Sequence, residues 1–165
     1  MVRKGTKASV KGKAAEFRKT ICRNRRAFHD YAVSEQIEAG LVLLGSEVKS
    51  LRAGKASIAE AYCKIIEGEA FLVGATISEY PWAHQFNHEP DRKRKLLLHA
   101  EQLARLFRAT QEKGITLVPL ELYFNEQGRV KCLFGLARGK RQYDRREDIR
   151  KRDEARDLAR VRLGR

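Results

Sequence analysis

Hydrophobic and polar positions in the first half of the chain change from alternation to a continuous apolar run. The stretch FHDYAV (residues 28–33) alternates as a half-buried strand does, and GLVLLGSEV (residues 40–48) predicts a buried strand. Val48 and Leu51 are three positions apart and Gly54 follows them, which favours a short helix that Ser46 would cap. We expect order to begin near Arg26.

Two pairs of β-rich runs predict hairpins. AYCKII (residues 61–66) and AFLVGATI (residues 70–77) are joined by EGE. ITLVPLELYF (residues 115–124) and RVKCLFGLA (residues 129–137) are separated by NEQG. Pro119 lies inside the third of these runs and cannot donate a ladder hydrogen bond, which predicts an edge strand or a bulge there.

The run LLLHAEQLARLFRATQEKG has the period of a helix. Leu103, Leu106 and Phe107 follow the i, i+3, i+4 spacing, and Gly114 comes after the last turn. Six strand-like segments and two or three helices, without strand–helix alternation, predict a mainly β (α+β) fold. The expected architecture is a small antiparallel six-stranded barrel with peripheral helices.

Positive charge is concentrated at the two ends of the chain. Residues 1–26 contain ten Lys and Arg against one Glu, and residues 138–165 contain twelve basic against six acidic residues. The stretch between them is nearly neutral, although the whole chain carries +14. Basic ends can follow a phosphate backbone and release its counterions, so nucleic acid fits better as a partner than a membrane surface.

These patterns divide the chain into three parts. Residues 1–22 are expected to be a disordered basic arm, residues 23–137 a β-barrel domain, and residues 138–165 a basic tail with few large apolar residues. Because no apolar run reaches the roughly 18 residues of a membrane span, and the N-terminus lacks an apolar signal core, we expect a cytoplasmic protein.

Catalytic and metal-binding chemistry have weak sequence signals. His29 and Asp30 are neighbours on a predicted strand and should point to opposite faces, which argues against an acid–base pair. His84 and His88 lie in a loop between prolines, where their spacing does not place them on one helix face. The three cysteines include no C-x-x-C pair. We therefore expect no catalytic site, no metal and no cofactor.

Two basic stretches inside the body are candidates for RNA contact. In EVKSLRAGK, Lys49, Arg52 and Lys55 recur every three positions, so on a helix they would line one side. In DRKRKLLL four cations precede three leucines, and the nearby Trp82 and Phe86 offer surfaces on which unpaired bases could stack. Solvated charged surfaces would explain both patterns equally well. The four cations are Arg92, Lys93, Arg94 and Lys95.

Five motifs in this order resemble one known family. They are NRRAFHDY, EAGLVLLGSEVKSLRAGKASI, FNHEPDRKRKLLLH, GITLVPLELYF and LARGKRQYDRREDIRKRD. Together they are similar to the bacterial SsrA-binding proteins, the small protein B family. The resemblance spans residues 22–157, and GSEVKSLRAGK and GKRQYDRREDI are its most specific parts.

The resemblance implies a fold and a function. The family has an oligonucleotide-binding-fold barrel and is not enzymatic. It binds the tRNA-like end of transfer-messenger RNA (tmRNA, or SsrA RNA) in trans-translation, which rescues stalled ribosomes and tags the unfinished peptide. The implied partners are tmRNA, the ribosome and, through the charged tmRNA, elongation factor Tu. We expect the protein to be a monomer.

The resemblance also implies roles for individual residues. Glu38, Leu97 and Lys131 correspond to the family's RNA-binding core. The tail is expected to be disordered when free and helical in the empty mRNA channel of the ribosome, with contacts near the decoding site. The residues implied in these contacts are Gly139, Lys140, Tyr143, Asp144, Arg145 and Arg146.

Two positions depart from the family pattern. Arg145 stands where Lys is common, which keeps the charge and adds planar, multi-donor hydrogen bonding. Tyr143 stands where His is frequent, so stacking is retained but imidazole protonation is not. Two other functional classes stay open at this point: a structural ribosomal protein with basic extensions, and a nuclease that uses His29, His84 or His88.

Overall fold

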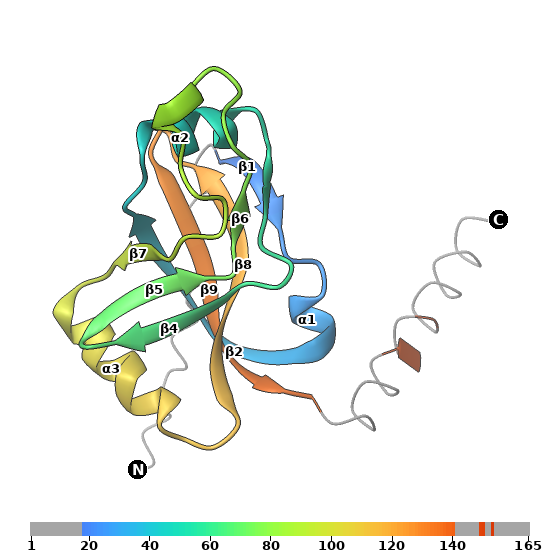
Figure 1. Ribbon diagram of the computed structural model, residues 1–165. Coiled ribbons are helices and arrows are strands. Elements are labelled where there is room, and N and C mark those ends of the chain that lie inside the picture. Colours follow the sequence, from blue (N-terminus) through green and yellow to red (C-terminus); the bar gives the residue numbers. More distant parts are fainter. Residues whose placement is uncertain (1–17, 141–148, 151–152, 154–165) are drawn as a thin grey trace, which may run out of the picture.

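The computed structural model describes residues 18–140, 149–150 and 153, and strands dominate it (Figure 1). The strands are β1 (Lys19–Arg23), β2 (Tyr31–Leu41), β3 (Ala56–Ser57), β4 (Tyr62–Ile66), β5 (Glu69–Val73), β6 (Thr76–Ile77), β7 (Arg94–Leu97), β8 (Ile115–Phe124) and β9 (Val130–Gly139). The helices are α1 (Ala27–Asp30), α2 (Gly45–Arg52), the 3₁₀ turn η1 (His84–Phe86) and α3 (Ala100–Thr110). Among the described residues, no helix has the length and apolar character that crossing a membrane requires.

The strand pairings close into a ring. β8 pairs with β4, β4 with β5, β5 with β7, β7 with β2, β2 with β9, and β9 returns to β8, all antiparallel. Only one residue pair, Cys63 with Leu117, joins β4 to β8 within the described chain, and β1 pairs with residues 121–124 at the end of β8. The expected antiparallel, mainly β fold with few peripheral helices is confirmed.

Both predicted hairpins are confirmed. Glu67 and Gly68, between β4 and β5, have φ values of 50° and 75°, the paired positive φ that a two-residue hairpin turn requires. The loop from Asn125 to Gly128 joins β8 to β9. The register of this second hairpin shifts between Pro119 and Glu121, so the proline marks a bulge, as predicted, but in a strand that is paired on both sides.

Two segments differ from the expected strands. Residues 27–30 form α1, because Asn24 Oδ1 accepts hydrogen bonds from the amides of Arg26 (3.2 Å) and Ala27 (3.1 Å) and turns the chain. The second segment, residues 40–48, leaves β2 after residue 41 and enters α2 at residue 45. The predicted buried strand is therefore wrong.

The N-terminus of α2 explains this second difference. The carboxylate of Glu47, the third residue of the helix, reaches back and accepts a hydrogen bond from the Leu44 amide (2.7 Å), and Leu44 rather than the expected Ser46 is the N-cap residue. The hydroxyl of Ser46 instead contacts the ring of His88 (3.0 Å). Val42 and Leu44 stay about half exposed, so the apolar run is not a buried one.

The interior of the ring is filled by aliphatic and aromatic side chains. Leu72, Leu117 and Phe134 are almost fully buried there, and Leu106 of α3 packs into the same cluster. Burial of each such side chain stabilises the fold by about 1.5–3 kcal/mol. A separate cluster of Leu51, Ile77, Phe124 and Val130 attaches α2 to one end of the ring. Figure 1 shows α2 and α3 at opposite ends of the barrel.

The described chain enters and leaves the barrel at opposite ends of β8. Lys19, at the start of β1, pairs with Phe124, whereas Arg138 near the end of β9 pairs with Ile115. Residues 19–22 therefore belong to the sheet rather than to the arm expected over residues 1–22, because β1 pairs with β8 and its apolar residues pack on the core. β9 likewise continues past residue 137 to Gly139.

Candidate nucleic-acid interface

Three of the predicted RNA-binding residues lie on one outer face of the barrel. Gly40 of β2 lies directly opposite Leu97 of β7 on one side and Lys131 of β9 on the other. Residues opposite each other in a ladder point to the same face, and so does Glu38, two positions before Gly40. On the far side of Lys131, Tyr123 of β8 continues the row. We call these five residues the Glu38 cluster.

The Glu38 cluster is held together by charge and hydrogen bonds. Lys131 Nζ lies 3.3 Å from Glu38 Oε1, and the Tyr123 hydroxyl donates to Glu38 Oε2. Burial by itself raises the pKa of Glu38, but the hydrogen bonds from Tyr123 and Lys131, with nearby positive charge, hold it below its ordinary value. Burial and the bond to Glu38 raise the pKa of Tyr123. The carboxylate therefore stays ionised at neutral pH and fixes the position of the lysine.

The missing side chain at position 40 opens a groove beside this cluster. A Cβ built on Gly40 would lie 3.4 Å from Leu97 Cδ1, so the glycine leaves one side of Leu97 uncovered, and this side chain is 53% exposed. The groove continues to Val48 of α2 and to Arg129 before β9. An apolar floor with cations at its rim suits a sugar–base edge next to a phosphate.

The cations of α2 lie on the surface of the helix whose Val48 lines this groove. Lys49 and Arg52 on the helix and Lys55 just beyond it are exposed, as the spacing predicted, although α2 ends at Arg52. Lys49 Nζ lies 5.2 Å from the centre of the Tyr80 ring, a cation–π contact. None of the ion pairs within the described chain uses these three cations.

Arg94 is a correction to the predicted interface. Its side chain has no exposure, and its Nε lies 2.8 Å from Oε1 of the equally buried Glu47. Three more of its five guanidinium hydrogens go to the carbonyls of Ala75 (2.5 Å), Pro90 (2.7 Å) and Arg92 (3.0 Å). A buried carboxylate must be paired, and Arg94 meets that need, so its guanidinium lies inside the fold and does not reach the surface where a phosphate would bind.

The other cations of DRKRK divide between structure and surface. Arg92 also binds Glu47, with Nη2 2.5 Å from Oε2, and keeps a quarter of its side chain exposed. Lys93 is exposed. Lys95 is partly exposed and pairs with Glu69. Of this stretch, Arg94 is therefore excluded from a surface contact by its burial. The exposed side chain of Lys93 and the exposed parts of Lys95 and Arg92 stay candidates.

The start of the predicted ribosome-contacting segment is attached to the barrel. Gly139 pairs with Tyr31 at the end of β9, and the amide of Lys140 donates to the carbonyl of Asp30 (2.9 Å). Lys140 Nζ also donates to the carbonyl of Phe28 (2.9 Å). Tyr143, Asp144, Arg145 and Arg146 lie outside the described residues.

The histidines do not form a common site in the described chain. His88 is buried and bridges the Ser46 hydroxyl and the carbonyl of Ile77, whereas His84 is exposed. Contrary to the strand argument, His29 Nδ1 does contact Asp30 Oδ1 (2.8 Å), because residues 27–30 are helical. No group of three or more His, Cys, Asp or Glu in the described ranges is placed to hold a metal ion.

Sequence reasoning missed two members of this surface. The hydroxyl of Tyr123 donates a hydrogen bond to Glu38, and the guanidinium of Arg18 lies 4.8 Å from the centre of the Tyr123 ring. The signal for Tyr123 was its position directly opposite Lys131 in the second hairpin, which becomes visible once the register is known. Arg18 precedes the first strand and carries no pattern of its own.

Comparison with known proteins finds one family, by a family model and by individual relatives. The family model described as SmpB protein matches residues 21–163. The SsrA-binding protein of Syntrophobacter fumaroxidans is 51% identical over 152 residues, 92% of this chain and 94% of that one. That of Bartonella tribocorum is 53% identical over 151 residues, 92% of this chain and 96% of its own length.

A solved structure agrees with this result. A chain of the structure called "tmRNA-SmpB: a journey to the center of the bacterial ribosome" shares 48% sequence identity with this protein. The match covers 78% of this chain and 94% of the other, with a TM-score of 0.63. The barrel, the position of the motifs and the similarity over nearly the whole length agree, and the chain belongs to the SmpB family.

Proposed function

We propose that this protein is the tmRNA-binding adaptor of trans-translation. The observation that carries the proposal is about half identity, over roughly nine-tenths of the chain, to proteins named for binding SsrA RNA. The similar chain in a tmRNA–SmpB ribosome structure supports the ribosome as the second partner. The protein acts by holding RNA rather than by catalysis, as a cytoplasmic monomer that meets elongation factor Tu through the charged tmRNA.

The Glu38 cluster is the proposed centre of the RNA contact. Leu97 offers an apolar surface to a sugar or base, and Lys131 a positive charge to a phosphate, at a distance fixed by their shared neighbour Gly40. Glu38 positions Lys131 and can accept a hydrogen bond from a 2′-hydroxyl or a base amino group. This combination recognises the shape of a folded RNA more than its sequence.

The surrounding cations supply attraction over a longer range. Lys49 and Arg52 are exposed on α2 and Lys55 just after it, and Lys93 and Lys95 lie at β7, with the exposed part of Arg92. Each phosphate that these residues neutralise adds to the salt dependence of binding. Arg94 contributes only through the fold, because it holds Glu47.

The tail carries the second half of the proposed function. Gly139 and Lys140 fix its starting point on the barrel, and the segment with Tyr143, Asp144, Arg145 and Arg146 contacts the decoding site, with the tail helical in the empty channel. A basic segment with few apolar residues orders when rRNA supplies the opposing charge.

Truncation after Lys140 tests this division of labour. This truncation keeps β9 and its contacts with α1 complete. A cut after residue 137 would instead remove the last two residues of β9, which pair with the start of β2. We expect tmRNA affinity, measured by filter binding, to stay within about threefold of the full chain, a change of about 0.7 kcal/mol. Peptide tagging on stalled ribosomes should be abolished.

The RNA that co-purifies with the full chain provides a second readout. Sequencing should find one dominant structured species with a tRNA-like end. Equal loss of binding and tagging in the truncated protein would refute the division of labour. Stable association with ribosomal subunits in cells that lack tmRNA would favour a structural ribosomal protein instead.

A further inference from the structure

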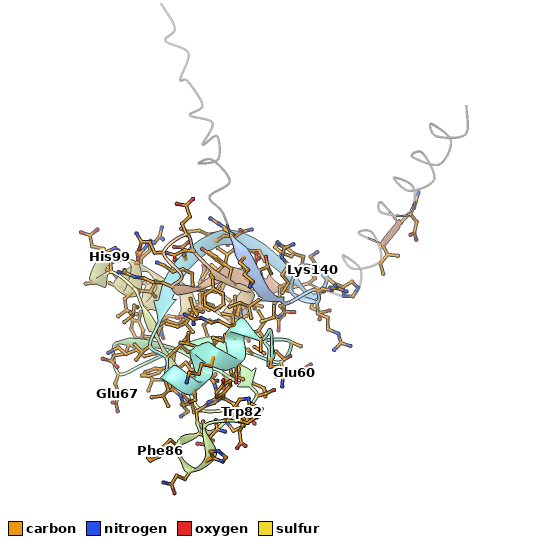
Figure 2. The ribbon with its side chains drawn as sticks, turned by 90° about the horizontal axis from the view of Figure 1, so that it is seen from above. Glu60, Glu67, Trp82, Phe86, His99 and Lys140 are labelled. Atoms are coloured by element: carbon orange, nitrogen blue, oxygen red, sulfur yellow. The ribbon has the colours of Figure 1, made fainter. Side chains whose placement is uncertain are left out.

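Two aromatic side chains are displayed on one projecting loop. Trp82 is 77% exposed and Phe86 is 80% exposed, the highest values among the large hydrophobic residues of the described chain. Both lie in the segment between β6 and β7, near η1, and Figure 2 shows them at the end of the molecule that extends past α2. They belong neither to the core nor to the Glu38 cluster.

The loop is fastened at its base. The side chain of Asn87 bridges the loop, accepting from the Tyr80 amide (3.0 Å) and donating to the Tyr80 carbonyl (2.9 Å). The buried ring of His88 bonds to the Ile77 carbonyl (3.0 Å), and Arg94 donates to the Pro90 carbonyl (2.7 Å). These bonds fix both ends of the segment that carries the two rings, so part of the ordering entropy of binding is already spent.

The backbone at the tip is also constrained. His84, between the two rings, has φ 44°, a left-handed conformation that a residue with a side chain adopts at a cost. Two exposed rings on a strained, fastened loop gain nothing for the fold, because neither ring packs against the described core clusters. Their arrangement is explained by a partner that covers them.

The neighbouring charges indicate what kind of partner this is. The loop begins beside Lys55, whose carbonyl accepts the Ser78 amide (3.1 Å), and its Tyr80 ring lies under Lys49. Lys49 on α2 and Lys55 just after it therefore lie beside the base of the loop that carries the two rings. The loop itself carries Glu79, Glu89 and Asp91, so the attraction for an anion comes from the helix side.

We infer that the tip of this loop, Trp82 with Phe86, is a stacking platform for unpaired RNA bases, and that Lys49 and Lys55 hold the adjoining phosphates. Aromatic rings beside cations are the usual means of binding unpaired nucleotides, because every base has a face on which a ring can stack. The platform is separate from the Glu38 cluster. It rests on the proposed function only in taking RNA as the partner.

Trp82 makes the inference directly measurable, because it is the one tryptophan of the sequence. The probes are an RNA hairpin with an unpaired loop and a blunt duplex of the same stem, each titrated into the full-length protein. Stacking should quench the fluorescence of Trp82 with the hairpin. The duplex, held by phosphate contacts alone, should bind with little quenching.

Variants separate stacking from charge. Trp82→Ala with Phe86→Ala should lower affinity for the hairpin by about tenfold, within the range of base–aromatic stacking, and leave the salt slope unchanged. Trp82→Phe keeps a ring and should stay within about twofold of wild type. Phe107→Ala, which removes a half-exposed ring on α3 at the other end of the barrel, is the matched control and should have no effect.

Several outcomes would overturn the inference. Equal quenching by hairpin and duplex, or unchanged hairpin affinity in the double variant, would exclude a base-stacking role. If the double variant kept full RNA affinity but lost binding to ribosomal proteins, the tip would be a protein-binding surface. Failure of the wild type to bind tmRNA would count against the proposed function and not against hairpin stacking, so the two failures can be told apart.

Discussion

A carboxylate without exposure to solvent, such as that of Glu47, is stable only while its charge is matched. Burial by itself raises the pKa of Glu47, but hydrogen bonds from Arg92, the Leu44 amide and Arg94 outweigh burial and hold it below the ordinary 4.5. A lowered pKa in the folded state means that the group stabilises the fold above the unfolded pKa. This contribution is lost as the pH falls through the folded value.

Glu47→Gln should therefore destabilise the protein by about 3–5 kcal/mol at pH 7, because two arginines lose their counter-charge and one of them is fully buried. The difference from wild type should begin to shrink below pH 4.5, where Glu47 of the unfolded wild-type chain starts to bind a proton, and should go on shrinking until the pH falls through the lowered folded pKa. Urea unfolding at pH 7 and at pH 4 measures both values. A difference that stays constant with pH would show that shape, and not charge, is the main contribution.

Gly40 is expected to matter for binding more than for folding. Gly40→Val adds a β-branched side chain that suits an outward strand position and covers the open side of Leu97. tmRNA affinity should fall by roughly tenfold, which corresponds to about 1.4 kcal/mol, while the thermal midpoint stays near wild type. Gel-shift titration beside a melting curve tests this. Loss of stability in proportion to affinity would contradict it.

At the scale of elements, Gly135 of β9 lies where two bulged strands meet. The register of β2 shifts between Val33 and Glu35, and a Cβ on Gly135 would lie 2.6 Å from Val33 Cγ1 and 3.3 Å from the Glu35 carbonyl oxygen. Leu120 of β8 approaches within 3.5 Å from the other side. β-branched Val33 has little rotamer freedom with which to move away.

Gly135→Ala should therefore destabilise the barrel by about 1–3 kcal/mol, the usual cost of overpacking. Gly45→Ala is the matched control, since a Cβ on this first residue of α2 meets nothing within 4 Å and should leave stability unchanged or slightly raised. Denaturant unfolding of both variants gives the comparison. Equal stability of the two would mean that the bulges can relax to accept a side chain.

The elements that the sequence predicted well are those whose cause is local. The turn at Glu67 and Gly68 lies between two β-rich runs, and the helix of α3 repeats its period over three turns. By contrast, α1 depends on the side chain of Asn24, and the end of β2 depends on the start of α2. A short apolar run contains no information about such contacts, so the strand prediction is correct for residues 31–33 of FHDYAV but wrong for residues 28–30, and wrong for GLVLLGSEV beyond residue 41.

The candidate site shows the same limit over longer distances. Lys49, Arg52 and Lys55 were predicted to be on the surface because their spacing is local, and they are exposed. Arg94 pairs with Glu47, which lies 47 positions earlier in the chain. A local sequence pattern could therefore not predict that Arg94 is buried. Glu38 and Lys131 came from the family resemblance, and their contact depends on the pairing of β2 with β9.

At the scale of the whole molecule, charge position can be tested through salt dependence. Arg52→Glu with Lys55→Glu should weaken tmRNA binding and reduce the slope of log affinity against log salt. The expected reduction is about 0.7 per lost contact to a single strand and about 0.9 to a duplex. Arg108→Glu with Lys113→Glu makes the same change of charge near the other end of the barrel and should affect the slope less. An identical decrease in both variants would indicate net charge alone.

The positions at which the chain joins and leaves the barrel make the barrel a spacer of fixed length. The Glu38 cluster and the start of β1 lie at the Phe124 end of β8, whereas Lys140 follows the end of β9 at the Ile115 end. Ten residues of strand separate the two ends by about 30 Å. The barrel therefore keeps an RNA bound at the Glu38 cluster at a fixed distance from Lys140, where the tail begins.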